Sequence, residues 1–286
     1  MDHTELDRLR NWIGRSQSVS DVIGPVPANL LAASLDCDDK PFEAGDALPP
    51  NWHRLYFLSA ARPADVGEDG HPARGLFLPP VPLPRRMFAG GHLTWHRPLR
   101  IGDKVTRVSE ITGVEGKHGR SGDLIFVTVR QKFLVEGTVA MEETQDLVYR
   151  EPESGPSARG SKPEAVEAGP WRREIRPDPV LLFRYSALTF NGHRIHYDYP
   201  YVTQVEGYPE RIVHGPLIAT FLLDLVRREA PRARVVDFSF RAQRPLFLGA
   251  PFKVSGWPAA DRRSVRLAAI DASGATAMAA EAGLAP

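Results

Sequence analysis

The chain has 286 residues, 42% of them hydrophobic, which suits one large domain or two ordinary ones and is too apolar for a disordered protein. Its formal net charge of +1 excludes a globally basic surface of the kind that binds nucleic acid. A single cysteine excludes an intramolecular disulfide framework, and no apolar run approaches the roughly 20 residues of a membrane span. Because the first residues are too polar for a secretion signal, we expect a cytoplasmic protein that binds neither membrane nor nucleic acid.

The first 86 residues combine two short helices with a long irregular stretch. Helical patterns cover Leu6–Ile13 and a segment that Pro27 opens and Leu35 closes. Residues 38–86 are rich in proline and glycine, which interrupt both helices and strands. We therefore expect loops over 38–86.

Strand patterns begin at Met87 and complete a first folded half, residues 1–150. Runs of strand-forming residues cover Met87–Thr94, Lys104–Val114, Asp123–Val135 and Val139–Tyr149, with a turn at 136–138. Long strands joined by tight turns predict an antiparallel sheet.

Residues 151–170 show neither pattern and concentrate proline, glycine, serine and charge, as linkers between folded units do. A second half, 171–286, follows. It opens with a segment at 179–190, then a short helix near Pro200–Glu206 and a longer one from Gly215 to Glu229 with an apolar stripe. Strands are predicted at 234–243, 250–257, 264–270 and 275–281.

The two halves share a fragment of sequence and an order of elements. Arg97–Gly102 (RPLRIG) recurs as Arg244–Gly249 (RPLFLG), each time between two strands, and 86–91 loosely matches 211–216. Helices precede the sheet in both halves. The pattern predicts a duplicated α+β domain, a double hotdog, in which each half wraps a long antiparallel sheet on a central helix. Two sheets joined edge to edge would leave a ligand cleft between the halves.

Titratable and polar residues gather in the second half, before and at the start of the long helix. They are Asn191, His193, His196, Asp198 and His214, and Gly215 follows the last of them. Their spacing resembles the active-site signature of the MaoC-like, or hydratase 2, family. In that signature an aspartate and an asparagine precede a catalytic histidine, a second aspartate follows, and a His-Gly pair opens the central helix.

Three longer motifs narrow the resemblance to one branch, over residues 15–285 or so. TFNGHRIHYD (189–198), PPVPLPRRM (79–87) and WHRLYF (52–57) are similar to fused hydratases. This branch includes mesaconyl-C4-CoA and itaconyl-CoA hydratases and type 2 3-hydroxyacyl-thioester dehydratases. The resemblance implies a hydro-lyase that adds water to a short branched enoyl-CoA, above all a C5 dicarboxylic one, to give a citramalyl-CoA.

The resemblance also implies roles for individual residues. The catalytic histidine of the family falls on His196, which can take a proton from water near neutral pH because an unperturbed imidazole has a pKa of about 6.5. The catalytic aspartate of the family falls on Asn191, which cannot ionise. Asp198, Glu206 and His193 all stay open as the source of an acid.

Two further groups are expected to hold the substrate. The N–H of Gly215, with His214 beside it, lies at the positive end of the predicted helix and would hold the thioester oxygen. Arg85 and Arg86 would bind coenzyme A phosphates or a carboxylate on the acyl chain. Structural roles compete with these: Asp198 or His214 would cap a helix, and the arginines would be solvated.

Other functions fit the same motifs. A 3-hydroxyacyl-CoA or acyl-carrier-protein dehydratase of fatty acid metabolism would use the site in reverse, while a thioesterase would release a free thiol. A non-catalytic acyl-thioester-binding module is the third alternative. We expect one site per chain, with a degenerate first half that shapes the pocket. We also expect no metal, no cofactor besides the coenzyme A of the substrate, and a homodimer.

Overall fold

The computed structural model describes residues 3–38, 40–119, 122–151 and 166–286. In the first half it contains α1 (His3–Arg10), β1 (Ser16–Val22), α2 (Pro25–Ser34), the short helices η1 (Trp52–Leu55) and η2 (Pro63–Asp65), β2 (Arg85–Trp95), β3 (Lys104–Gly119), β4 (Gly122–Val135) and β5 (Thr138–Arg150). The second half contains β6 (Trp171–Ile175), α3 (Pro179–Leu188), η3 (Arg194–His196), η4 (Tyr201–Val205), α4 (Gly215–Glu229), β7 (Arg234–Ala242), β8 (Phe252–Pro258), β9 (Ser264–Ile270) and β10 (Thr276–Ala285).

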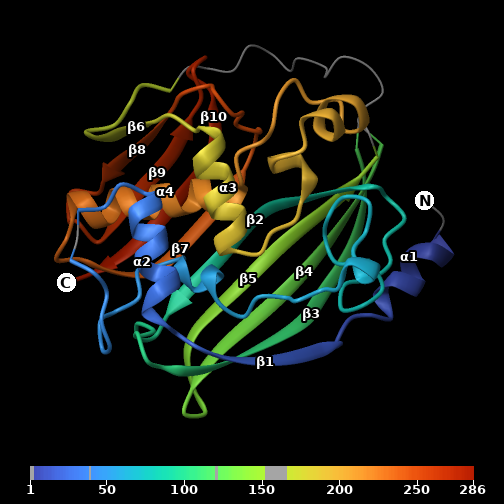
Figure 1. The fold of residues 1–286 in the computed structure, drawn as a ribbon, viewed down its shortest axis with the longest axis horizontal. Coiled ribbons are helices and arrows are strands. Elements are labelled where there is room, and N and C mark those ends of the chain that lie inside the picture. The colour runs from blue at the N-terminus through green and yellow to red at the C-terminus, as the bar shows by residue number, and fades with distance from the viewer. Residues whose placement is uncertain (1–2, 39, 120–121, 152–165) are drawn as a thin grey trace.

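One ten-stranded antiparallel sheet runs through both halves, in the order β1-β3-β4-β5-β2-β7-β10-β9-β8-β6. Counted inwards from its own edge, each half places its strands in the same order: the first, third, fourth, fifth and second of that half along the chain. The halves join where β2 pairs with β7, from Gly90 opposite Arg241 to Thr94 opposite Asp237. In Figure 1 the joined sheet spans the width of the molecule.

Equivalent hydrogen bonds show which segments correspond in the duplication. Leu48 donates its N–H to the carbonyl of Leu99, and Val213 donates to that of Leu246, both at 2.8 Å. The two RPLxxG segments are therefore equivalent, as the sequence predicted. The looser match of 86–91 with 211–216 is wrong, because 86–91 lie within β2 whereas 211–216 lead into α4.

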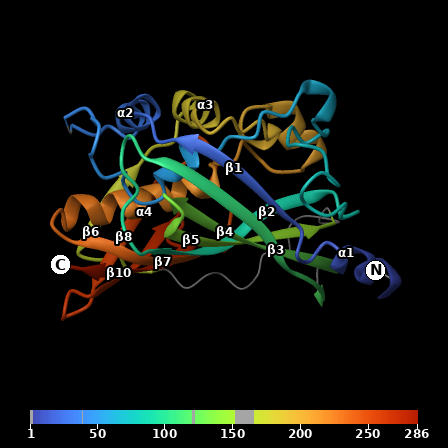
Figure 2. The same ribbon diagram turned by 90° about the horizontal axis from the view of Figure 1, so that it is seen from below.

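The helices cover one face of the sheet, as Figure 2 shows, and α2 lies beside α3. In the second half α4 packs against β6, β8, β9 and β10 and contributes ten buried residues to the core. The corresponding position in the first half holds the short helix η1, and Phe57 soon after it has a φ of 58°. One core cluster contains residues of both halves, including Leu31, Phe133 and Leu217.

The sequence patterns did not predict β1 and β6, and they did not identify the segment at 179–190 as a helix. The strands β1 and β6 are edge strands: β1 is largely exposed, and β6 is only five residues long with charged residues at its three central positions. The segment predicted at 179–190 forms α3, which Asp178 caps by accepting the N–H of Leu181 at 2.8 Å. Most of the predicted linker at 151–170 lies outside the described residues, so that boundary stays a prediction.

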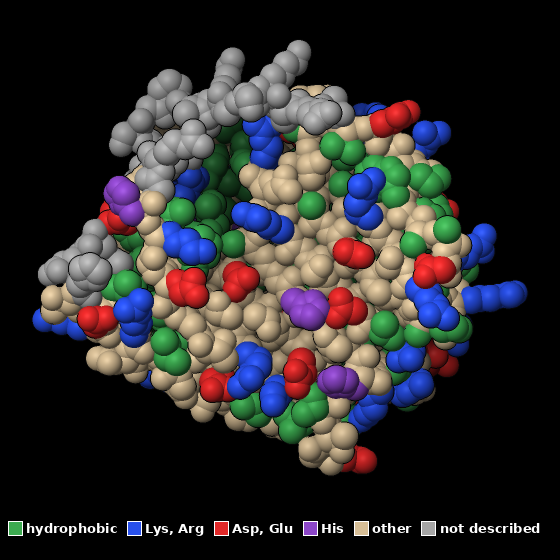
Figure 3. All heavy atoms as spheres, turned by 180° about the vertical axis from the view of Figure 1, so that it is seen from behind, with side chains coloured by type: hydrophobic (Ala, Val, Ile, Leu, Met, Phe, Trp, Pro, Cys, Tyr) green, Lys and Arg blue, Asp and Glu red, His purple; other side chains and the backbone are tan. Residues whose placement is uncertain are grey.

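On the face seen in Figure 3, basic and acidic side chains are interspersed. Within the described ranges, no helix is both long and apolar enough to cross a membrane.

Candidate active site

A turn after α3 presents the histidine-rich segment. Phe190 adopts a φ of 47°, and the N–H of Asn191 then donates to the carbonyl of Ser186 at 2.8 Å. The side-chain oxygen of Asn191 accepts the N–H of His193 at 3.0 Å, an Asx turn that sets the direction of η3. Asn191 thus shapes the backbone ahead of His196; a catalytic role for it stays a prediction.

His196 is buried with one ring nitrogen fixed. Its Nδ1 lies 2.7 Å from the carbonyl oxygen of Ile212. Because a carbonyl can only accept, Nδ1 must carry the hydrogen, and Nε2 is left with its lone pair. Burial lowers the pKa of His196 to about 4, so its imidazole is neutral and basic at Nε2 near neutral pH.

His214 stacks on His196 at the start of α4. The two ring centroids are 3.6 Å apart with planes 20° from parallel. Nε2 of His214 lies 2.8 Å from the hydroxyl of Ser186, while Nδ1 is buried and has no hydrogen-bond partner among the described residues. The residue is the N-cap of α4 and makes no side-chain cap bond, so the ring of His196 stacks on the residue that begins this helix.

His71, which the sequence analysis missed, comes from a loop of the first half. Its ring centroid lies 4.3 Å from that of His193, which in turn lies 5.5 Å from that of His196. The loop is held closely, because a Cβ on Gly70 would lie 1.9 Å from the carbonyl oxygen of Gly192. The only sequence signal was the pair of glycines in GEDGH, which permits this approach of two backbones.

The four histidines form a row of neutral rings. Burial lowers the pKa of His71, His193 and His214 well below 6.5, and the neighbouring histidines lower them further. No group of three or more His, Cys, Asp or Glu in the described part of the chain could hold a metal ion. The row therefore offers acid–base and hydrogen-bonding groups.

The rate and the stability should respond differently to pH. We expect kcat/KM to stay flat as pH falls from about 7.5 to about 5 and to drop near pH 4, where His196 takes up its proton. The unfolded chain binds these protons at about pH 6.5, before the folded chain does, so the free energy of unfolding should fall below that pH. Initial rates and thermal unfolding across this pH range measure both. A rate limb near pH 6.5 in folded protein would contradict the assignment.

The two carboxylates considered as acids have other partners. One oxygen of Asp198 accepts from Arg194 at 2.9 Å and the other accepts the N–H of Tyr201 at 3.1 Å, so its contacts favour the capping role. Glu206 is mostly buried and pairs with Arg85, with Nε 3.0 Å from Oε2. Burial raises the pKa of Glu206.

The two predicted substrate arginines differ in their surroundings. Arg85 is neutralised by Glu206, whose backbone carbonyl also accepts from it. Arg86 forms a long ion pair, with Nη2 3.9 Å from the carboxylate of Asp69, and it also interacts with the side chain of Tyr149. Its charge also helps to lower the pKa of His71 and His193, which places it within electrostatic range of the histidine row. The role of either arginine in binding the substrate stays a prediction.

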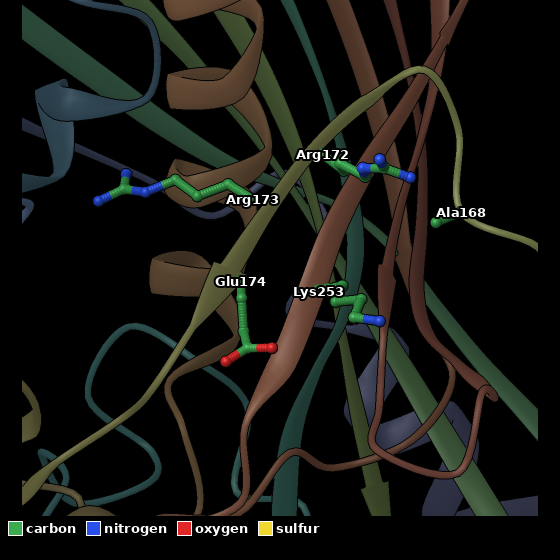
Figure 4. Close-up of a pocket in the computed structure, with 5 residues that line it drawn as sticks. All are labelled: Ala168, Arg172, Arg173, Glu174 and Lys253. Carbon is green, nitrogen blue, oxygen red and sulfur yellow. The ribbon is translucent and has the colours of Figure 1, made fainter.

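A surface pocket between β6 and β8 lies apart from these residues (Figure 4). It is lined by Ala168, Arg172, Arg173, Glu174 and Lys253. Arg173 points away from the other labelled side chains and donates to buried Asp224 at 2.8 Å. None of the predicted site residues lines this pocket.

Comparisons with known proteins identify the family of the chain. A family model described as hydroxyacyl-thioester dehydratase type 2 matches residues 51–248. The chain belongs to this family. Mesaconyl-C(4)-CoA hydratase of Chloroflexus aurantiacus is 47% identical over 273 residues, which cover 94% of this chain and 95% of that protein. The MaoC-like family predicted from the motifs is therefore confirmed.

Solved structures confirm the fold. A MaoC-like dehydratase from Phytophthora capsici matches with a TM-score of 0.71 at 14% identity over 98% of both chains. A Mycobacterium tuberculosis protein described as having a double hotdog fold matches with a TM-score of 0.57 at 14% identity over 96% of both chains. The α+β double-hotdog prediction is confirmed for this family member.

Proposed function

We propose that the chain hydrates the C=C bond of a short branched enoyl-CoA, namely a C5 dicarboxylic one such as mesaconyl-C4-CoA. The observation that carries the proposal is the buried, neutral His196, whose Nδ1 is held by a carbonyl and whose ring stacks on His214, the N-cap residue of α4. The identity to a mesaconyl-C(4)-CoA hydratase over nearly the whole chain supports the substrate. The family name itself describes hydro-lyase chemistry.

The reaction needs one base and one site for negative charge. Nε2 of His196 takes a proton from water as the water oxygen bonds to the β-carbon, and the electrons of the double bond move towards the thioester oxygen. The N–H of Gly215 holds that oxygen, because a helix N-terminus stabilises developing negative charge. The imidazolium then returns its proton to the α-carbon. The net change is one added water, and no carboxylic acid is required at position 191.

The other candidate functions fit the site less well. A thioesterase that activates water with a carboxylate would need a free one, but Asp198 and Glu206 are engaged by Arg194 and Arg85. A fatty acid dehydratase would use the same histidine in reverse, and it would accept long acyl chains. The position of Arg86 favours the short dicarboxylate.

The direct test mixes pure protein with mesaconyl-C4-CoA and crotonyl-CoA and follows the absorbance of the conjugated enoyl thioester, while hydration of itaconyl-CoA is followed by mass spectrometry. We expect fast loss with a C5 dicarboxylate and slow loss with crotonyl-CoA. A free-thiol assay runs in parallel. Thiol release without hydration would overturn the proposal, and loss only with long-chain enoyl thioesters would favour the fatty acid dehydratase.

Two other properties stay predictions of the sequence. A cytoplasmic location is predicted from the composition. A homodimer is predicted because most soluble oligomers are symmetric dimers. We propose that the first half shapes the substrate pocket, since His71 and Arg86 reach the histidine row from it.

A further inference from the structure

A second buried polar network lies in the first half and uses the WHRLYF motif. Glu143 on β5 has a fully buried side chain, which accepts from Arg54 and lies 3.0 Å from Nε2 of His53. Burial alone would raise the pKa of Glu143, but the charge of Arg54 and the contact with His53 hold it at about 2. An ionised, fully buried carboxylate with two partners is a fixed point in the core.

Hydrogen bonds extend from this fixed point into the other half. Arg54 donates through Nε to the side-chain oxygen of Asn51 at 2.7 Å. The amide nitrogen of Asn51 then donates to the hydroxyl of Thr220 at 2.8 Å and to the carbonyl of Pro216 at 3.2 Å. Asn51 holds a φ of 70°, a left-handed conformation that asparagine tolerates better than most residues. The network therefore ends at Pro216 in the first turn of α4 and at Thr220 in the second.

The same network also touches the other side of Gly215. The guanidinium of Arg54 lies 5.3 Å from the ring centroid of Phe88. A ring carbon of Phe88 lies 3.8 Å from where a Cβ on Gly215 would be. Gly215 is thus flanked by Pro216, which Asn51 holds, and by Phe88, which Arg54 contacts.

We infer that Asn51, Arg54 and Glu143 are positioning residues that aim the N–H of Gly215 at the thioester oxygen. This inference rests on the proposed hydratase function. A donor that stabilises charge in a transition state must be held within a fraction of an ångström, and the first turn of a helix is its least constrained part. The network anchors that turn to the central sheet of the first half, so the half without the catalytic histidine sets the geometry of the site.

The test replaces Thr220 by valine, which removes the hydroxyl and keeps the shape, with Thr220→Ser as the matched variant that keeps the hydroxyl. We expect kcat for mesaconyl-C4-CoA to fall about tenfold in Thr220→Val, with KM little changed, and to recover in Thr220→Ser. The acid limb of the pH profile should not move, because His196 is untouched. Asn51→Gly, which keeps the left-handed backbone, should lower kcat in the same way.

Infrared spectra of bound butyryl-CoA, labelled with ¹³C at the thioester carbonyl, separate positioning from a structural role. A hydrogen bond from Gly215 lowers the carbonyl frequency. We expect this lowering in the wild type and Thr220→Ser, and a smaller one in Thr220→Val and Asn51→Gly. A wild-type frequency in folded Thr220→Val would overturn the inference, whatever its kcat. A wild type that neither hydrates enoyl-CoA nor shifts the carbonyl would instead overturn the proposed function.

Discussion

Replacing His196 with alanine is expected to lower kcat for hydration by about 10³-fold, because a positioned general base contributes roughly that factor. His196 has a lone pair at Nε2 and a pKa of about 4. Its imidazole is therefore neutral at pH 7 and can accept a proton from water. Stopped-flow or steady-state absorbance assays with mesaconyl-C4-CoA measure the fall in kcat. Circular dichroism checks the fold, since the lost ring also stacks on His214.

His92→Ala is the matched control for this substitution. His92 lies on β2, and its half-exposed ring pairs only with a surface carboxylate, Asp237, at 2.6 Å. We expect activity near that of the wild type. If folded His196→Ala retained wild-type kcat, the general base would have to be another residue, and His193 would be the first to test because its ring is the next in the row.

Replacing Arg86 with glutamine should change substrate preference more than activity. We expect kcat/KM for mesaconyl-C4-CoA to fall about 10²-fold, since a charge-assisted hydrogen bond to a carboxylate contributes about 1.5–3 kcal/mol. Crotonyl-CoA has no free carboxylate, so its kcat/KM should change little. The ratio of the two kcat/KM values, measured on one preparation, cancels any difference in the active fraction.

Arg86→Lys and Arg85→Gln sharpen this experiment. Lysine keeps the charge and should retain part of the preference. Arg85→Gln should mainly lower the thermal unfolding temperature, because it leaves Glu206 buried without its cation. An equal fall for both substrates in Arg86→Gln would contradict carboxylate recognition. A loss of preference in folded Arg85→Gln alone would move that role to Arg85.

Local sequence patterns predicted the elements whose own residues determine them. The helix α4 spans Gly215–Glu229 as predicted, because proline follows its first residue and its apolar stripe has a helical period. The strands β3, β4 and β5 follow their β-branched runs and extend further than predicted at one or both ends. The edge strands were missed because neither buries a full face.

Contacts between distant segments limited the prediction of the site. His196, His214 and Gly215 were found because a short motif carries them. His71 joins them through contacts between its loop and residues 192–194, including the close approach of Gly70 to Gly192 and the N–H of Arg194 donating to the carbonyl of Asp69. The different environments of Arg85 and Arg86 depend on Glu206 and Asp69, which lie 121 and 17 positions away from their partners.

Addition of water to a carbon–carbon double bond at this site is tested most directly by running the reaction with mesaconyl-C4-CoA in water labelled with ¹⁸O. The products are analysed by mass spectrometry. The hydratase account predicts an intact acyl-CoA that is heavier by one labelled water, with the label on the acyl chain. Free coenzyme A and an acid labelled in its new carboxylate would contradict it and identify a thioesterase.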